Sequence, residues 1–239
     1  MFCAAFSTLY CGVGFIVSER LAPRSGRFAR WGARWGRMVF RPAGIRVEAD
    51  ATEDIPSLTP CVFVANHQNA LDIPAMLMAL PVEFGFVAKA SLERVPVLGR
   101  AIATSPSVFV ERRDPRRSHA SMRTAATRIR EGSSVLVFPE GERSYGRNVM
   151  PFKRSAFVLA AEAGVPVVPV TIHDAYRLFD ERHRAARAGT IRVTMGSSFR
   201  IDGVERTEIQ HAATRARDII RSRMESTALP TRVDDERRG

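Results

Sequence analysis

The sequence predicts an α/β domain with a largely parallel sheet of about seven strands covered by helices, preceded by a membrane-associated pair of N-terminal helices. From about Ile45 onward, short runs rich in β-branched residues alternate with helical patterns, which is typical of a parallel sheet covered on both faces. The chain has 239 residues, of which 45% are hydrophobic, so it has room for one such domain and a short appendage. We therefore divide it into anchoring helices (1–42), the α/β domain (43–228) and a polar tail (229–239).

Seven apolar runs have the length and composition of strands. They cover residues 45–48, 61–65, 84–88, 107–110, 134–138, 167–172 and 191–195. Three helices have readable ends, marked by proline at the start or glycine just beyond the end. They run from about 114 to 132, from about 153 to 163 and from about 204 to 224. In such a sheet ligands bind beyond the carboxyl ends of the strands, so functional residues are expected directly after each strand.

Residues 1–18 contain no charged side chain. As a helix they would be about 27 Å long at about 1.5 Å per residue, close to the thickness of a bilayer core. Gly12, Gly14 and several hydroxyl side chains weaken the segment, so a half-inserted or re-entrant helix fits it nearly as well as a marginal membrane span. Positive charge follows from Arg20 onward rather than preceding the segment as in a cleaved signal peptide. We therefore expect the domain at the cytoplasmic face of the cell (inner) membrane.

The next segment, PRSGRFARWGARWGRMVFRP, predicts an amphipathic helix. At about 100° per residue, five arginines share one face and an apolar group that includes both tryptophans shares the adjoining face. This pattern is typical of a helix lying in a membrane interface, with its guanidinium groups on lipid phosphates. The predicted membrane-binding residues are Arg27, Arg30, Trp31, Arg34, Trp35 and Arg37. The alternative is a surface helix packed on the domain through its tryptophans.

The net charge of +11 implies an anionic partner, which could be a phospholipid surface, nucleic acid or a phosphorylated small molecule. Nucleic-acid binding favours aromatic side chains among the basic residues, but the main aromatic cluster here adjoins an apolar segment. We therefore expect a membrane lipid bilayer and no nucleic acid. Cys3, Cys11 and Cys61 lack the CxxC spacing of a metal or redox site, and we interpret them as buried thiols in a reducing compartment.

The most informative stretch is VANHQNALDIP, which follows the expected strand 61–65. On a continuous helix a spacing of five would set His67 and Asp72 about 140° apart, so they could not pair there. They can meet if His67 lies in a turn and Asp72 begins the next helix, which Pro74 in a first helical turn permits. The alternative is that Asp72 is only an N-cap and His67 only a turn residue.

Polar residues also follow the other expected strands. Lys89 follows 84–88, Glu111 and Arg112 follow 107–110, and PEGER follows 134–138. Taken in order, the segments between residues 61 and 172 resemble the four motif blocks of the glycerolipid acyltransferase family. The segments are NHQNALD, VAKASLERVPVLG, SVFVERR, VFPEGERS and GVPVVPVTI. The nearest kin look like the 1-acylglycerol-3-phosphate acyltransferases of bacterial membranes.

This resemblance implies transfer of a fatty acyl group from acyl-ACP or acyl-CoA to the sn-2 hydroxyl of 1-acylglycerol-3-phosphate, giving phosphatidic acid. His67 would be the general base, and Asp72 would orient its imidazole and stabilise the imidazolium. Such a mechanism needs no metal, no bound cofactor and no covalent intermediate. The resemblance also implies the substrate-binding residues Asn66, Lys89, Arg112, Glu140, Gly141 and Arg143. Among them the three basic residues match positions that bind the acceptor phosphate.

Three positions depart from the family pattern: Glu142 stands where threonine is usual, and Pro106 and Ser155 stand where glycine is usual. Because Glu142 adds negative charge beside the expected phosphate site, another lysolipid, such as a lyso-ornithine lipid or a lysophospholipid, is an alternative acceptor. A non-catalytic anionic-lipid-binding protein would use the same basic charge, but it has no need of His67 and Asp72. A metal-dependent hydrolase is disfavoured because no further histidine lies in a ligand-like motif near His67.

Overall fold

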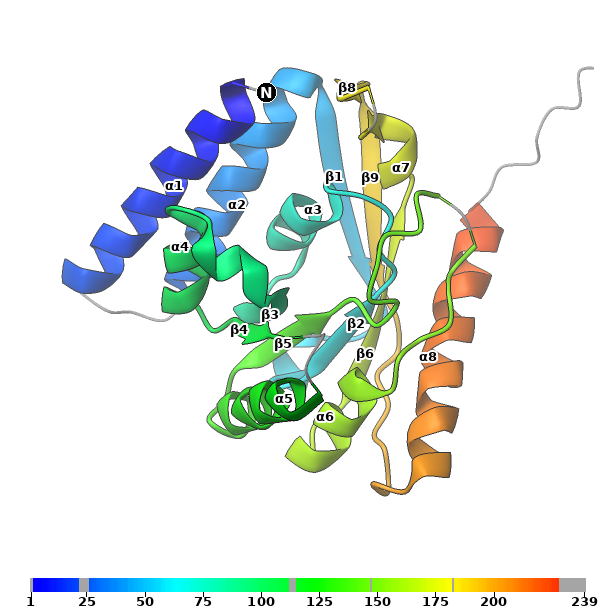
Figure 1. Ribbon diagram of the computed structural model, residues 1–239. Coiled ribbons are helices and arrows are strands. Elements are labelled where there is room, and N and C mark those ends of the chain that lie inside the picture. Colours follow the sequence, from blue (N-terminus) through cyan, green and yellow to red (C-terminus); the bar gives the residue numbers. More distant parts are fainter. Residues whose placement is uncertain (1, 22–25, 112–114, 147, 182, 228–239) are drawn as a thin grey trace, which may run out of the picture.

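The computed structural model describes residues 2–21, 26–111, 115–146, 148–181 and 183–227. In these ranges a seven-stranded sheet has the strand order β1-β9-β6-β2-β5-β3-β4 (Figure 1). The strands are β1 (Ile45–Ala51), β2 (Val62–Ala65), β3 (Phe84–Lys89), β4 (Val108–Val110), β5 (Ser134–Val137), β6 (Val167–His173) and β9 (Gly189–Met195). All seven strands expected from the sequence are confirmed. A two-stranded hairpin of β7 (Phe179–Asp180) and β8 (Ala185–Ala186) was not expected.

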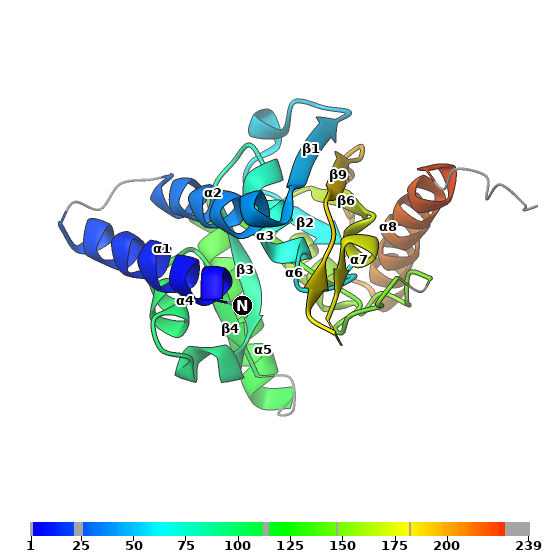
Figure 2. The ribbon, with the colours of Figure 1, turned by 90° about the horizontal axis from the view of Figure 1, so that it is seen from above.

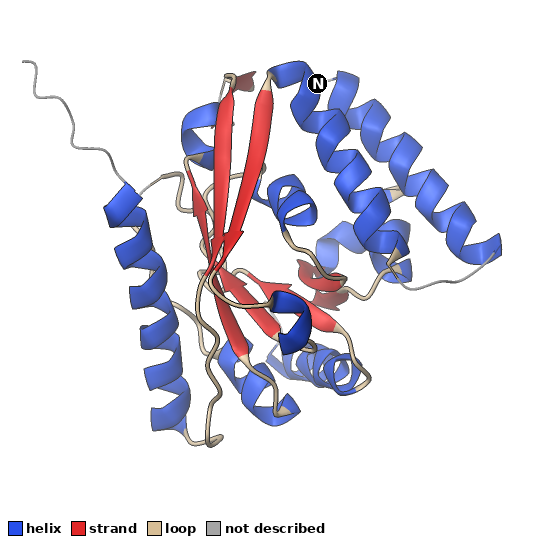
Figure 3. Cartoon of the chain, turned by 180° about the vertical axis from the view of Figure 1, so that it is seen from behind, coloured by secondary structure: helices blue, strands red, loops and turns tan. Residues whose placement is uncertain are grey.

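The sheet is largely parallel, as predicted. Strands β4, β3, β5, β2 and β6 run in one direction, whereas β9 is antiparallel to β6 and parallel to β1. The two long strands β1 and β9 stand side by side in Figure 3. Because β2 lies between β5 and β6, the segments that follow these three strands meet at one edge of the sheet. This is where ligands bind in parallel sheets.

Helices cover both faces of the sheet. The helices of the described residues are α1 (Phe2–Leu21), which packs on α2 and α4, α2 (Arg27–Phe40), α3 (Asp72–Ala79), α4 (Leu98–Thr104), α5 (Pro115–Arg130), α6 (Ser155–Ala163), α7 (Ala175–Leu178) and α8 (Arg206–Thr227). The three helices that were expected beyond residue 114 correspond to α5, α6 and α8. Short 3-10 turns occupy Arg41–Ala43, Ile55–Leu58 and Ala90–Arg94. Figure 2 shows α1 and α2 side by side on one flank of the molecule and α8 on the opposite flank.

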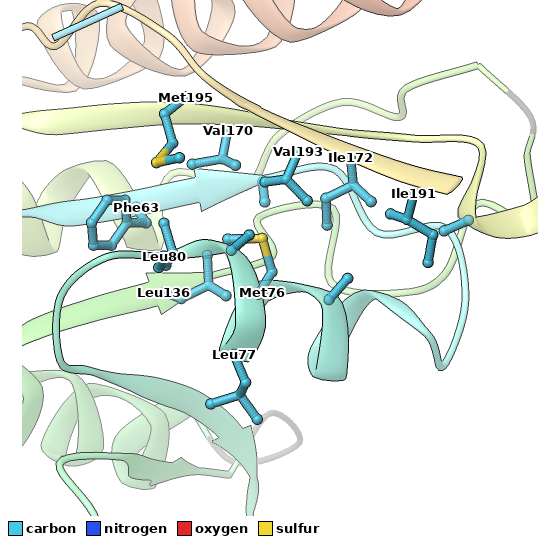
Figure 4. Packing of buried hydrophobic residues seen from close by; sticks show 14 of the residues in the cluster. Phe63, Met76, Leu77, Leu80, Leu136, Val170, Ile172, Ile191, Val193 and Met195 are labelled. Atoms are coloured by element: carbon cyan, nitrogen blue, oxygen red, sulfur yellow. The ribbon is translucent and has the colours of Figure 1, made fainter. Parts of the chain in front are cut away.

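The sheet separates two apolar cores. On one face α2 and α3 pack over a cluster that contains Phe63, Leu136 and Ile172, and Figure 4 shows Met76 of α3 directed toward these side chains. On the other face α5, α6 and α8 cover the alternate side chains of the same strands. This alternation follows from the period of two along a strand, and it makes the central strands continuous apolar runs.

Glycines bring α2 close to the domain. A Cβ at Gly32 would lie 2.7 Å from Leu77 Cδ2, and one at Gly36 would lie 2.7 Å from Met78 Cγ. The glycines of the WGARWG repeat therefore let α2 pack closely against α3. The side of α2 that bears Phe28, Trp35 and Val39 contacts the first core.

The two tryptophans of α2 do not lie as the interfacial interpretation predicted. The indole N–H of Trp31 donates to Ser18 Oγ at 3.2 Å, and that of Trp35 donates to Thr8 Oγ1 at 3.0 Å. Both hydroxyls belong to α1, and a Cβ at Gly14 of α1 would collide with the Trp31 ring. The tryptophans therefore join α1 to α2. The alternative, a helix packed on the domain through its tryptophans, holds for Trp35, which also packs on the first core.

The exposed apolar surface of this helix pair lies on α1. Its large exposed side chains include Phe6, Leu9, Val13 and Val17, which recur at helical spacing on one face. Over the described residues, no helix is both long enough and apolar enough to cross a bilayer.

Candidate active site

His67 and Asp72 form a pair at the turn that joins β2 to α3. The strand β2 ends at Ala65 and α3 begins at Asp72, so the histidine lies in the turn and the aspartate in the first turn of the helix, as predicted. The distance from His67 Nδ1 to Asp72 Oδ2 is 2.7 Å. Pro74 is the third residue of α3, where a missing N–H leaves no helical hydrogen bond unmade. The prediction that the two side chains pair is confirmed.

The side chain of Asp72 holds the turn that precedes it. Its Oδ2 also accepts the backbone N–H groups of Gln68 at 2.5 Å and Asn69 at 2.9 Å. Asp72 is therefore more than a helix cap, because one oxygen fixes both the histidine ring and two residues of the turn. Its Oδ1 has no hydrogen-bond partner among the described residues.

The rest of the turn is held by other side-chain oxygens. The N–H of His67 donates to Glu140 Oε1 at 2.7 Å, that of Ala70 to Glu181 Oε1 at 2.6 Å, and that of Leu71 to Asn69 Oδ1 at 2.9 Å. Each backbone N–H from His67 to Leu71 thus finds an acceptor on a side chain. Three of the acceptors are carboxylates, and charged acceptors make the stronger hydrogen bonds. These hydrogen bonds hold the main chain of His67 and of the four residues that follow it.

The environment of Asp72 determines how the pair works. The carboxyl is fully buried, and burial raises the pKa of Asp72 above its ordinary value, while the hydrogen bond and charge of His67 act in the opposite direction. As a carboxylate, Asp72 can only accept hydrogen bonds, so it keeps the proton of His67 on Nδ1. Nε2 is then the unprotonated nitrogen of the ring, and among the described residues nothing donates to it. The pair therefore presents a general base.

An aromatic ring and a hydroxyl complete the setting of His67. Its imidazole stacks on Phe138 with the ring centroids 4.2 Å apart and the planes at 18°. Its carbonyl accepts the backbone N–H and the hydroxyl of Ser144, at 2.7 and 3.0 Å. Both partners belong to the segment after β5, which lies beside β2 in the sheet. The first motif block, NHQNALD, and the third, VFPEGERS, are therefore one structural unit.

Glu140 acts on the main chain at this site. It is 4% exposed, and its two oxygens accept the N–H groups of His67 and Met150. Burial raises the pKa of Glu140, and the hydrogen bond from His67 opposes the rise. The prediction that Glu140 binds substrate stays a prediction, but both of its oxygens already have protein donors.

Asn66, which was also expected to bind substrate, has a side chain that contacts the protein backbone. Its side-chain amide donates to the carbonyl of Ile172 at 2.9 Å, and its Oδ1 accepts the N–H of the same residue at 2.8 Å. This two-way contact ties the end of β2 to β6. With both polar atoms engaged and 1% exposure, Asn66 supports the frame of the site, and its contact with substrate stays a prediction.

Three of the remaining predicted residues, Arg143, Lys89 and Gly141, lie at or just after strands that end at the same edge of the sheet. Arg143 is 37% exposed and contacts Glu181 Oε2 through Nη1 at 2.8 Å. Lys89 is exposed at the end of β3 and has no ion-pair partner among the described residues. Gly141 has a φ of +81°, which favours glycine. Arg112 lies outside the described residues, so its predicted role stays a prediction.

Two further residues at the site were not found from the sequence. Glu181 lies at the β7–β8 hairpin, more than a hundred residues from the turn it contacts, and no local pattern marks it. The side chain of Lys153 lies over Gly141, where an added Cβ would collide with its Nζ. Lys153 lies close to the third block in the sequence, and this proximity could have indicated that it belongs to the site.

Comparison with known proteins agrees with this arrangement. A model of the acyltransferase family matches residues 46–173, a range that begins in β1 and ends with β6 and includes the whole turn around His67. The chain belongs to the acyltransferase family. The resemblance seen in the motif blocks is thereby confirmed.

Several relatives within the acyltransferase family share more than the motif blocks. The chloroplastic 1-acyl-sn-glycerol-3-phosphate acyltransferase BAT2 of Brassica napus is 39% identical over 139 residues, which are 58% of this chain and 40% of that protein. The 1-acyl-sn-glycerol-3-phosphate acyltransferase of Haemophilus influenzae is 33% identical, with 58% of each chain covered. The human 1-acyl-sn-glycerol-3-phosphate acyltransferase alpha is 31% identical over 73% of this chain and 62% of its own. The matched part is thus about two fifths to three fifths of these relatives.

A solved structure has the same fold. The crystal structure of the 1-acyl-sn-glycerophosphate (LPA) acyltransferase PlsC from Thermotoga maritima superposes with a TM-score of 0.74, at 24% sequence identity. The match covers 93% of this chain and 95% of that one. The N-terminal helices and the sheet of this acyltransferase are therefore parts of a shared architecture.

Proposed function

We propose that this protein transfers a fatty acyl group from an acyl thioester to the sn-2 hydroxyl of 1-acylglycerol-3-phosphate, giving phosphatidic acid at a membrane surface. The observation that carries the proposal is the 2.7 Å contact between His67 Nδ1 and buried Asp72, which leaves Nε2 as a base. The names of the relatives support the choice of acceptor. The thioester of acyl carrier protein or of coenzyme A is a substrate here, and the reaction requires no bound cofactor or metal.

In this reaction His67 Nε2 takes the proton of the acceptor hydroxyl as its oxygen attacks the thioester carbonyl carbon. The C–O bond forms and the carbonyl electrons move onto oxygen, giving a tetrahedral intermediate. When these electrons return, the C–S bond breaks and the leaving thiolate takes up the proton from the imidazolium. Asp72 stabilises the imidazolium between the two steps. Every atom and proton is accounted for by the two substrates and one imidazole.

The acceptor phosphate calls for positive charge near the base. Arg143 and Lys89 can provide it, since Arg143 follows β5 and Lys89 is the last residue of β3, and both strands end at the edge of the sheet where His67 lies. The planar guanidinium of Arg143 can donate to two oxygens of a phosphate. Glu142 is exposed, so its charge is screened by solvent. We therefore favour the phosphomonoester acceptor over a lysolipid with another head group.

The helix pair supports action at a membrane. The exposed apolar side chains of α1 offer a face that can enter the lipid surface, and the exposed arginines Arg30, Arg34 and Arg37 of α2 can contact lipid phosphates. Arg27 serves the pair itself, since its Nη1 donates to the Ser18 carbonyl at 2.5 Å. This placement would hold the site at the surface from which lysolipid and product exchange. We propose the cytoplasmic face of the cell membrane as its location.

The test is acyl transfer by the full chain in phospholipid vesicles. Labelled acyl-ACP and acyl-CoA are each offered with lysophosphatidic acid, a lyso-ornithine lipid or lysophosphatidylcholine. We expect phosphatidic acid from wild type and a loss of at least about a hundredfold in His67→Ala. His183→Ala is the matched control, because His183 Nδ1 also lies 2.7 Å from a carboxylate, that of Asp180, but on an exposed surface. Failure to acylate lysophosphatidic acid with either donor would refute the proposal.

A further inference from the structure

Glu181 connects the first and third motif blocks through a contact that neither block encodes. The residue lies in the short segment that links β7 to β8. Its Oε1 accepts the N–H of Ala70 at 2.6 Å, inside the turn that holds His67, and its Oε2 lies 2.8 Å from Arg143 Nη1. One carboxylate thus ties the basic side chain of the third block to the turn of the first.

This contact fixes the orientation of Arg143 and adds little to the stability of the fold. The side chains of Glu181 and Arg143 are 18% and 37% exposed, and ion pairs at such exposure add little to the stability of a fold. Both hydrogen bonds nevertheless have the short lengths of charge-assisted contacts. What they supply is a fixed direction for a long side chain that would otherwise sample many rotamers.

Arg143 is held through only one of its nitrogens. Nη1 contacts Glu181, and the remaining guanidinium N–H groups have no acceptor among the described residues. An arginine anchored in this way can direct its free N–H groups at the two oxygens of an anionic group. Because its rotamers are already restricted, it loses less conformational entropy when the anion binds.

We propose that Glu181 is a positioning residue for the acceptor: it holds Arg143 in the orientation that receives the phosphate of the lysolipid, at a fixed place relative to His67. This inference rests on the proposed function, since it assigns a phosphate-bearing acceptor to Arg143. It differs from a role in acid–base chemistry, because Glu181 contacts neither the imidazole nor Asp72. It predicts an effect on acceptor binding and not on the proton transfers.

Steady-state kinetics of the full chain in vesicles give the first test. We expect Glu181→Ala to raise the KM for lysophosphatidic acid by about tenfold, with kcat and the KM for the donor changed by less than about threefold. Glu181→Gln retains one acceptor oxygen and should lie between Ala and wild type. Asp180→Asn is the matched control, since Asp180 lies next in the chain but pairs with His183, and it should leave every constant unchanged.

Two outcomes would overturn the inference. If Glu181→Ala lowers kcat and melting temperature while the KM for lysophosphatidic acid stays constant, Glu181 only supports the fold. If Glu181→Ala or Glu181→Gln lowers that KM, the carboxylate competes with the phosphate for Arg143 and does not present it.

Binding of glycerol 3-phosphate, the head group of the acceptor, gives a test that needs no catalysis. Calorimetric titration of the full chain in detergent should show weaker binding in Glu181→Ala and in Arg143→Ala, and the double variant should be no weaker than Arg143→Ala. If the losses of affinity in the two single variants multiply in the double variant, or if wild type does not bind glycerol 3-phosphate, Glu181 does not position Arg143. If binding depends on Glu181 but wild type fails to acylate lysophosphatidic acid, the proposed function fails and the positioning role stands. If wild type acylates lysophosphatidic acid and Glu181→Ala binds glycerol 3-phosphate normally, the positioning role fails and the proposed function stands.

Discussion

The backbone N–H of His67 donates to Glu140 Oε1 at 2.7 Å, so the glutamate of the third motif block holds the main chain of the histidine of the first. The second oxygen of Glu140 accepts the N–H of Met150 and fixes the loop that follows β5. Adjacent strands make this possible, because β2 and β5 are neighbours with Val64 opposite Val137. The two motifs therefore act as one unit, and the consequences can be measured.

Replacing Asp72 with Asn should lower kcat by about a hundredfold to ten-thousandfold. Asparagine carries no negative charge, so the imidazolium that forms during the reaction loses the carboxylate that stabilises it. The measurement is kcat in vesicles, with circular dichroism to show that the fold is intact. Asp180→Asn, which removes the exposed carboxylate beside His183, should retain full activity. Activity above about a tenth of wild type in Asp72→Asn would contradict the assigned role.

The buried carboxyl of Glu140 should make stability depend on pH. Its pKa in the fold is raised above the ordinary value of 4.5, so between 4.5 and the raised pKa the folded state binds more protons than the unfolded state. The free energy of unfolding that Glu140 contributes is therefore greatest below this window and falls as pH rises through it. Asp72, whose pKa is raised by burial, acts in the same direction.

Chemical denaturation of wild type and Glu140→Gln across pH 4.5 to 8 measures this dependence. Glutamine cannot ionise, so the difference in free energy of unfolding, variant minus wild type, should increase with pH. Glutamine can accept only one of the N–H groups of His67 and Met150; this loss shifts all values of the variant by the same amount and does not change the slope. A difference that is constant or decreases with pH would show that Glu140 is not held in a proton-favouring environment.

Gly141→Ala should reduce activity more than its effect on stability explains. Gly141 and Gly164 both have a positive φ, of +81° and +67°, so alanine at either position costs about 1 to 2 kcal/mol in backbone strain. Only at Gly141 would the new Cβ collide with a side chain, that of Lys153, whereas the space at Gly164 is open. Melting temperatures should therefore fall similarly, while acyl transfer falls only in Gly141→Ala. Equal activity in the two variants would exclude a role for this close contact.

The exposed face of α1 should govern attachment to lipid. Val13 and Val17 are 43% and 48% exposed, so burying the exposed part of each side chain stabilises by roughly half of the about 1.5 to 3 kcal/mol that full burial gives. Val13→Asp with Val17→Asp should lower the fraction of protein that sediments with anionic vesicles by more than tenfold. Exposed residues on the opposite flank, such as Arg221 of α8 with its partner Asp218, provide a control by charge reversal. A full chain that never sediments with vesicles at low salt would refute membrane attachment.

Much of the fold could be predicted because its signals are local. A run of β-branched residues favours a strand wherever the chain places it, and the glycines and prolines around α5 and α6 end helices through their own backbone preferences. The His67 to Asp72 pair belongs to the same class, since a turn of four residues and Pro74 bring the two together. The β7–β8 hairpin has no such signal, because its strands are two residues long.

The tryptophans of α2 show the limit of a periodic pattern. A helical wheel places Trp31 and Trp35 on one apolar face, but it does not specify whether lipid or protein covers that face. Ser18 and Thr8 supply hydrogen-bond acceptors, and Gly14 supplies space, so α1 covers it. The apolar face left exposed belongs instead to α1.

The sequence by itself determined the seven strands of the main sheet, the helices α5, α6 and α8, and the pairing of base and carboxylate, because each depends on residues close together in the chain. It also determined the family, through motifs that each lie within one short stretch of the chain. Only the tertiary structure decided that Asn66 is bound to Ile172 and that Glu181 joins Ala70 to Arg143. These contacts link residues more than thirty positions apart, and they exist because β2 lies between β5 and β6. Strand order depends on how whole layers pack together, and no local preference encodes it.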